Sequence, residues 1–241
     1  MLIDSRTLFG DQLTAFDGNV GHVKDLYFDD KNWVVRYVVA DTGNWLKSRL
    51  VLLSPHAFGH LRPGATALHV NLSKEQIEQS PPIESHQTVS RKYEVDYFRY
   101  YGWPAYWNGG SLWGMAAYPV VTSSLEAEVS DNPKVLHRAD KHLRGTREIL
   151  GYDVQTAEGP VGTVSGLMLD DTSWAVQQMA VDTGHWFSGK EILISTTDVE
   201  SISYEESRVY VRLSKHEISD TQADEVASGH PVKQAEQIFV D

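Results

Sequence analysis

Gly18-Asn19-Val20-Gly21-His22-Val23 recurs 141 positions later as Gly159-Pro160-Val161-Gly162-Thr163-Val164. The register extends outward from these stretches without a gap and aligns residues 2–77 with residues 143–218. About 23 of the 76 aligned positions are identical. Because chance does not hold one register over that length, the sequence predicts an internal duplication. Two copies are too few for a solenoid, so we expect two homologous domains.

The identities gather where the chain is expected to turn. A pair of aspartates precedes Trp33 and recurs before Trp174, and an Asp-Thr-Gly triplet at residues 41–43 recurs at residues 182–184. Asp and Gly favour tight turns because Asp hydrogen-bonds nearby backbone and Gly accepts a positive φ. We therefore assign a structural turn role to Asp29, Asp30, Asp41, Gly43, Asp170, Asp171, Asp182 and Gly184.

Between these turns the hydrophobic residues alternate with a period of two, which is typical of short strands. In the first copy the pattern predicts strands at about residues 20–28, 33–39, 50–53 and 68–72. Ser73 and Gln76 have the spacing of a helix capping box, which residues 214–217 repeat. Closing a sheet removes its exposed edges. We therefore expect a mainly β protein with two small antiparallel β-barrels, short capping helices and a helical, aromatic connecting segment.

This organisation divides the chain into a first barrel (1–77), a connector (78–142), a second barrel (143–218) and an acidic tail (219–241). The connector holds 10 of the 25 aromatic residues between positions 93 and 118. Its tyrosines at 93, 97, 100 and 101 share one face of a helix that Gly102 is expected to end. Three roles are open for the aromatic segment. It packs on the chain's own barrels, it forms a dimer or partner interface, or it stacks on nucleic-acid bases. Its interaction candidates are Tyr97, Tyr101, Trp103, Tyr106, Trp107 and Trp113.

Each copy resembles a PRC-barrel domain in the strand start at residues 18–23, the paired aspartates before Trp33 and the Asp-Thr-Gly-x-Trp turn. Residues 100–104 and 143–148 are similar to double-barrel bacterial members of that family. The family includes the cytoplasmic domain of the photosynthetic reaction-centre H subunit and a ribosome-maturation factor. The resemblance implies a non-catalytic barrel that docks onto proteins. It leaves open an adaptor or self-associating module, an accessory factor of a photosynthetic or electron-transport complex, and a ribosome or RNA-maturation accessory factor.

Composition narrows the class of partner. The formal net charge is −12, and the absence of cysteine excludes disulfides and thiolate chemistry. Charge opposes generic nucleic-acid binding, since neutralising phosphates needs a surplus of Lys and Arg. No leader or transmembrane segment is apparent in the sequence, so we expect a soluble, cytoplasmic protein. Residues 2–77 hold 8 basic and 8 acidic residues, whereas residues 143–218 hold 6 and 12. An acidic partner is therefore expected to meet the first barrel or the connector.

Three patterns in the sequence resemble catalytic or metal sites. Paired Asp-Thr-Gly triplets are typical of aspartic peptidases, in which Asp41 and Asp182 would share a proton. Bulky Trp45 and Trp186 follow the triplets, which favours turns instead. The aspartate pairs lack the spaced ligands of a calcium loop, and His56 and His60 lack an evident third zinc ligand. We predict a non-enzymatic protein with no metal and no cofactor, which binds one or more protein partners or forms a homodimer.

Overall fold

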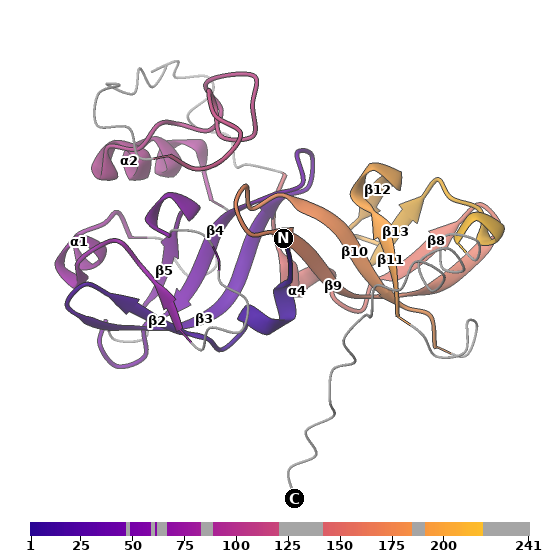
Figure 1. The fold of residues 1–241 in the computed structure, drawn as a ribbon, viewed down its shortest axis with the longest axis horizontal. Helices are drawn as coiled ribbons and strands as arrows, with labels where there is room; N and C mark the ends of the chain where they lie inside the picture. Colours follow the sequence, from indigo (N-terminus) through magenta and orange to yellow (C-terminus); the bar gives the residue numbers. More distant parts are fainter. Residues whose placement is uncertain are drawn as a thin grey trace, which may run out of the picture.

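The computed structural model describes residues 1–46, 49–58, 61, 67–82, 89–120, 142–184 and 191–218. Within these residues the chain is mainly β, with two sheets and a few short helices (Figure 1). The predicted tail (219–241), residues 121–141 of the connector and His60 lie outside the described residues.

The first sheet has the strand order β5-β4-β3-β2-β6, and β7 pairs with the far end of β3. Its elements are β1 (Leu2–Asp4), η1 (Ser5–Leu8), β2 (Gln12–Ala15), β3 (Gly18–Asp29), β4 (Val34–Asp41), β5 (Leu50–Leu53), η2 (Pro55–Ala57), β6 (Ala67–His69) and α1 (Lys74–Glu78), with β1 placed in the other sheet. The predicted strands at residues 20–28, 33–39 and 50–53 and the Ser73–Gln76 capping box are confirmed. The strand predicted at residues 68–72 is shorter and ends at His69. The prediction of purely antiparallel pairing is wrong, because β6 returns alongside β2 in parallel.

The second sheet repeats this order as β11-β10-β9-β8-β13-β12, with β1 paired to β9. Its half of the chain contains β7 (Leu143–Gly145), α4 (Thr146–Ile149), β8 (Asp153–Thr156), β9 (Gly159–Asp170), β10 (Val176–Asp182), β11 (Glu191–Ser195), η4 (Thr196–Asp198), β12 (Val199–Ser203) and β13 (Arg208–Val211). Most of these elements begin within one or two residues of the 141-position offset. An ancestral duplication remains our interpretation of that correspondence.

The prediction of closed barrels needs correction. Among the described residues, no strand ladder joins β5 to β6 or β11 to β12. The chain instead turns through a short 3-10 helix after β5 and after β11. In the first half a single bridge, Phe58 with Val70, follows that turn. At this turn each sheet bends back toward its other end, but no ladder of strand-to-strand hydrogen bonds closes it in the described part of the chain. Both sheets therefore stay open.

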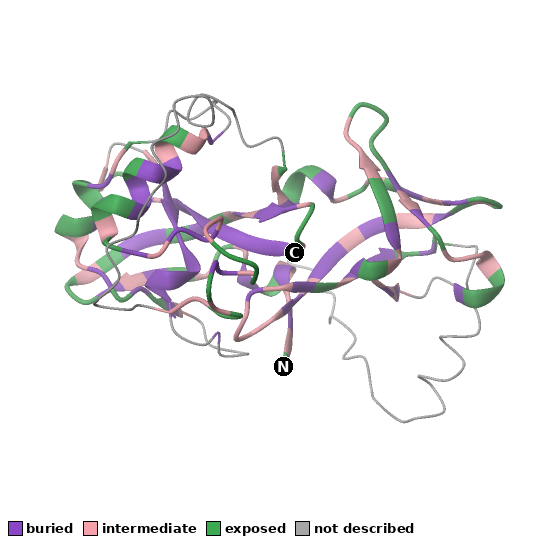
Figure 2. Cartoon of the chain, turned by 90° about the horizontal axis from the view of Figure 1, so that it is seen from above, coloured by how far each residue is buried: buried purple, intermediate pink, exposed green. Residues whose placement is uncertain are grey.

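The two halves exchange equivalent strands. β1 leaves the first half to pair with β9, and β7 leaves the second half to pair with β3. Between these pairs lies one bridge, in which Val34 faces its own counterpart, Ala175. The buried hydrophobic residues of both halves form one continuous core (Figure 2). The halves are therefore joined by backbone hydrogen bonds as well as by apolar packing.

The glycines of the opening motif are explained by close backbone approach. Gly21 has φ +138°, and a Cβ on it would lie 2.0 Å from the carbonyl oxygen of Asp41. Gly162 repeats this contact, 2.2 Å from the carbonyl oxygen of Asp182. Because any side chain would collide with that backbone, both positions require glycine.

Candidate functional site

The aromatic part of the connector begins with helix α2 (Arg91–Tyr101), which lies against the first sheet (Figure 1). The Ser90 side chain accepts from the backbone N–H of Tyr93 at its start. Gly102 ends it in the left-handed conformation with φ +67°. The predicted helix and its terminating glycine are therefore confirmed. Tyr97 packs edge-on against Tyr37 of β4, with 5.6 Å between ring centroids.

Burial separates the six interaction candidates into two groups. The side chains of Tyr97, Trp103, Tyr106 and Trp113 are buried, the most exposed of them at 6%. Trp113 donates from Nε1 to the carbonyl of Ser173 in the second half, at 2.7 Å. These four residues therefore contribute to the chain's own core. Tyr101 and Trp107 are partly exposed and remain candidates for contact with another molecule.

A buried carboxylate fixes α2 to the sheet. Glu94 is fully buried, and its Oε1 accepts hydrogen bonds from Tyr37 (2.9 Å) and Tyr106 (2.7 Å). Its Oε2 lies 2.8 Å from the guanidinium of Arg91. Burial is the main cause that raises the pKa of Tyr37 well above its ordinary value. The Tyr37 phenol therefore stays a protonated donor. A buried charge with several hydrogen-bonded partners specifies how the connector sits on the sheet.

Arg36 of β4 is a second buried charge beneath the loop that follows α2. Its side chain is 2% exposed, donates to the carbonyl of Leu112 and lies 3.4 Å from Asp29 Oδ2. The guanidinium also covers the ring of Tyr106, 3.8 Å from its centroid. Arg36 is not among the residues that the sequence motifs indicate. Its position inside the apolar run 34–40 is the one sequence signal of its role, because a charge buried in a strand needs specific partners.

His56 is a core residue of the first half. It is stacked on Trp103 with 5.5 Å between ring centroids, and its Nδ1 lies 2.9 Å from Ser54 Oγ. Burial, followed by the charge of Arg36, lowers the pKa of His56 to about 3. Within the described residues, no group of three His, Asp or Glu side chains gathers as a metal site would require.

The turn residues have the predicted local geometry. The carboxylates of Asp41 and Asp182 accept from the backbone N–H of Gly43 and Gly184, at 3.0 and 2.9 Å. β4 and β10 run in opposite directions from the antiparallel Val34–Ala175 bridge, and Asp41 and Asp182 lie at their far ends. Seven residues of strand span roughly 20 Å. The two carboxylates therefore lie too far apart to share a proton, as the peptidase alternative requires.

Other predicted turn aspartates have roles that local sequence did not indicate. Asp30 Oδ1 lies 2.8 Å from His142 Nδ1, and its Oδ2 accepts from the Tyr204 hydroxyl at 2.7 Å. Asp171 accepts from the N-terminal ammonium of Met1, also at 2.7 Å. Asp170 caps its own turn through the backbone and hydroxyl of Ser173. Asp30 and Asp171 therefore also hold the two halves together.

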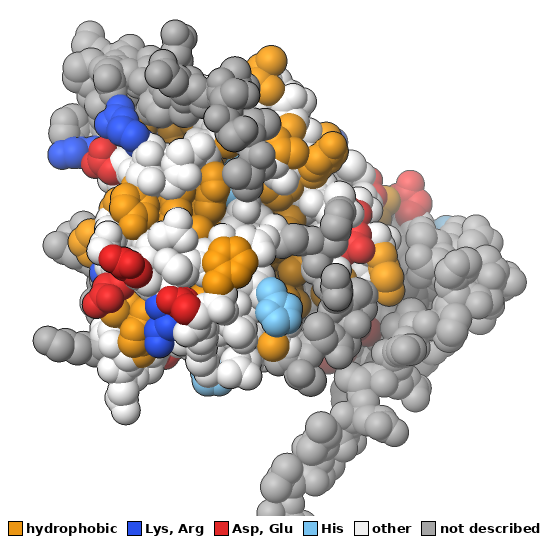
Figure 3. Space-filling model, turned by 60° about the vertical axis from the view of Figure 1, so that its left-hand side comes forward, with side chains coloured by type: hydrophobic (Ala, Val, Ile, Leu, Met, Phe, Trp, Pro, Cys, Tyr) orange, Lys and Arg blue, Asp and Glu red, His pale blue; other side chains and the backbone are white. Residues whose placement is uncertain are grey.

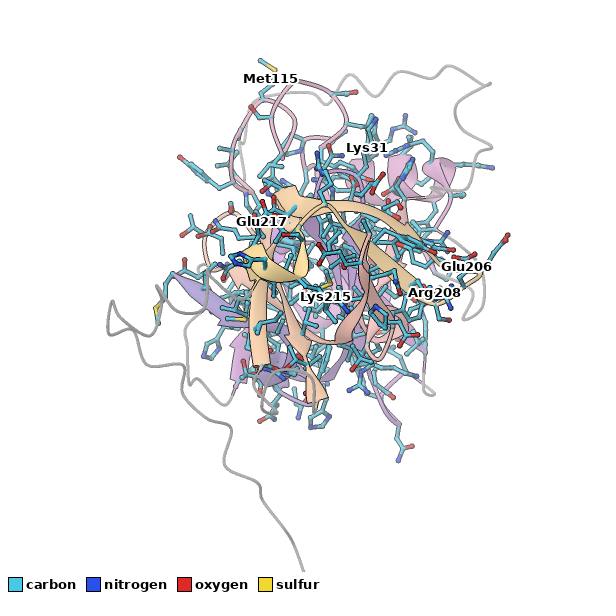
Figure 4. All side chains as sticks on the ribbon, turned by 90° about the vertical axis from the view of Figure 1, so that its right-hand side faces the viewer. Lys31, Met115, Glu206, Arg208, Lys215 and Glu217 are labelled. Carbon is cyan, nitrogen blue, oxygen red and sulfur yellow. The ribbon has the colours of Figure 1, made fainter. Side chains whose placement is uncertain are left out.

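A polar pocket of about 620 Å³ opens where the β3–β4 turn, α2 and the loop of residues 103–120 meet. It is lined by Asp29, Lys31, Asn32, Arg36, Arg91, Tyr106, Trp107, Gly109, Gly110, Ser111, Leu112, Ala117 and His142. Beside it the loop exposes Met115 and Tyr118, at 84% and 52%. Figure 4 shows Met115 at the outer end of the loop, with Lys31 below it on the same side of the molecule. The pocket and these apolar side chains form the candidate site.

Comparison with known proteins identifies the fold. The model of the PRC-barrel domain matches residues 5–77 and again residues 143–218. The matched segments cover more than half of the chain, so the protein belongs to the PRC-barrel domain family. No curated protein sequence matches the chain. Within the part of the chain that the structure describes, no helix is long and apolar enough to cross a membrane.

Proposed function

We propose that this chain is a non-enzymatic, cytoplasmic docking protein that binds a protein partner through the outer surface of the loop formed by residues 103–120. The observation that carries the proposal is the exposure of Met115 and Tyr118 on a loop whose neighbouring aromatic residues are fixed in the core. Large apolar side chains on a fixed base are typical anchors of protein interfaces. PRC-barrel domains often mediate protein interactions, which supports this function.

Other parts of the structure support a role as a platform. Figure 3 shows apolar side chains on several parts of this face of the first half, with Lys, Arg, Asp and Glu side chains among them. Trp107, partly exposed, adds an aromatic surface between the pocket and the core, because its ring packs on Phe98 at 5.4 Å. The base of the loop is fixed by Trp113 and Arg36. A partner would therefore meet a loop whose base loses little freedom on binding.

Affinity capture from cells of the source organism tests the proposal. We expect Met115→Asp and Trp107→Ala to lose proteins that the unaltered chain captures. Phe16→Asp is the matched control, because Phe16 is 74% exposed on a different turn. Capture of the same proteins by all variants, or losses common to Phe16→Asp, would overturn the proposal.

Self-association is the second form of the same proposal. Light scattering would then show a mass that rises with concentration and falls in Met115→Asp, again with Phe16→Asp as the control. The electron-transport and ribosome-maturation roles implied by the family resemblance stay predictions. A peptidase assay with Asp41→Asn and Asp182→Asn tests the enzyme alternative.

A further inference from the structure

The pocket beside the docking loop has the size and chemistry of a binding site. Its volume of about 620 Å³ is within the usual range for ligand pockets. Most of its lining is polar, and the cations on it come from separate elements: Lys31 from the β3–β4 turn, Arg36 from β4 and Arg91 from α2. One carboxylate, Asp29, lies among the lining residues.

The negative charge of Asp29 is already shared among several donors. Its oxygens accept from the backbone N–H groups of Lys31 and Asn32, both at 3.0 Å, and from the Asn32 side chain at 2.6 Å. The contact with Arg36 is longer, at 3.4 Å. A carboxylate has about four lone-pair sites. The oxygens of Asp29 are therefore hydrogen-bonded mainly within their own turn. Its negative charge neutralises the positive charge of Arg36 only in part.

Arg36 retains hydrogen-bonding capacity. Its Nε is buried and has no hydrogen-bond partner among the described residues. The carbonyl of Leu112 and the ring of Tyr106 hold the guanidinium in place. A fixed guanidinium at the base of a polar pocket is suited to binding a carboxylate, because its planar donors match the two oxygens.

Two more cations stand nearer the opening. Lys31 is exposed on the turn, and Arg91 lies over the ring of Trp107 with 4.3 Å to the centroid. Glu94, behind the Tyr106 ring, balances Arg91, and Asp30 lies beside His142. Three cations, Lys31, Arg36 and Arg91, line the pocket together with one carboxylate, Asp29. When the nearby Glu94 and Asp30 are included, cations and carboxylates are equal in number. Of the lining cations, Lys31 is the exposed one.

We propose that this pocket binds the carboxylate of an Asp or Glu side chain in an acidic segment of the protein partner. The inference rests on the proposed docking function and names the chemistry that the loop's partner presents beside Met115. The second half has 6 basic against 12 acidic residues, so it repels such a segment and directs it to the first half. The lining itself holds three cations and one carboxylate, which suits an anionic group such as a carboxylate.

Binding of a fluorescein-labelled hexaglutamate peptide to the full chain, followed by anisotropy at low salt, tests the inference. We expect Lys31→Glu to weaken binding at least tenfold, because it reverses the charge of the exposed lining cation without touching the core. Lys92→Glu is the matched control, since Lys92 is an exposed cation on α2 that does not line the pocket. It should change affinity less than twofold. Arg36→Met is a second variant, interpreted after circular dichroism shows that it folds.

Three results would overturn the inference: no binding of hexaglutamate, equal weakening by Lys31→Glu and Lys92→Glu, or displacement of the peptide by oligouridylate or inorganic phosphate at lower concentration than by free hexaglutamate. The docking function fails separately. If partner capture depends on Met115 but not on Lys31, docking holds and the carboxylate site is wrong. If hexaglutamate binding depends on Lys31 but Met115→Asp captures the same partner proteins as the unaltered chain, the assignment of the docking surface to the loop is wrong.

Discussion

The backbone N–H of Val35 donates to the carbonyl of Trp174 at 2.9 Å, and the equivalent N–H of Val176 returns the bond to the carbonyl of Trp33 at 2.7 Å. This reciprocal pair surrounds the bridge between Val34 and Ala175. The same local geometry is used from both sides, as in the self-complementary interface of a symmetric dimer. The two halves are therefore joined as a pseudo-dimer within one chain.

A disulfide across this bridge should form readily. Residues in a non-hydrogen-bonded antiparallel pair lie about 4.5 Å apart at Cα, which is within the range for disulfides. The chain has no cysteine, so Val34→Cys/Ala175→Cys introduces one pair and no competitor. We expect quantitative oxidation within a monomer on non-reducing gels, with both single variants as controls. Disulfide-linked dimers would show instead that halves of different chains exchange.

Gly21→Ala and Gly162→Ala should each destabilise the protein by about 3 kcal/mol, because a backbone carbonyl occupies the space of the new Cβ and φ is positive. Denaturant unfolding measures the effect. Gly110→Ala is the control, since its Cβ would meet nothing within 4 Å and its φ is not in the left-handed region. Equal stability of all three variants would contradict the close approach of the strands.

The buried carboxylate predicts a coupled pair of tyrosines. Tyr37→Phe and Tyr106→Phe each remove a donor to Glu94 Oε1 and should cost about 2 kcal/mol in the free energy of unfolding. Because both phenols serve one oxygen, the double variant should deviate from additivity. Tyr100→Phe, which removes an exposed hydroxyl bonded to the carbonyl of Gln76, is the control with a smaller effect. Strict additivity would show that the donors act independently.

Acid should unfold the first half partly through His56. Burial lowers the pKa of His56 to about 3, below its ordinary value near 6.5. As the pH falls from about 6.5 to about 3, the unfolded chain takes up a proton that the folded chain refuses, so stability falls by up to about 1.4 kcal/mol per pH unit. His56→Gln should flatten the dependence of unfolding free energy on pH in this range. Exposed His69→Gln is the control, and identical slopes for His56→Gln and the unaltered chain would contradict this account.

Much of the local structure could be predicted from short-range pattern. The turn at Asp41 and Gly43, the capping box at Ser73 and the helix end at Gly102 each depend on residues within a few positions of one another. Strand positions followed from alternation, because a half-buried strand repeats every two residues. For the candidate site, the sequence indicated the aromatic connector but not which of its rings are buried.

The amino-acid sequence alone determined the repeat, the β character, the turns and the family of the domain. The tertiary structure decided that β1 and β7 change places, that the sheets stay open, that Trp113 and Tyr97 are core residues, and that Arg36, Arg91 and Lys31 share one pocket. The physical reason is the range of the interactions. A strand of three residues carries no local signal of its partner, so pairing across more than 100 residues is settled when both halves pack into one core.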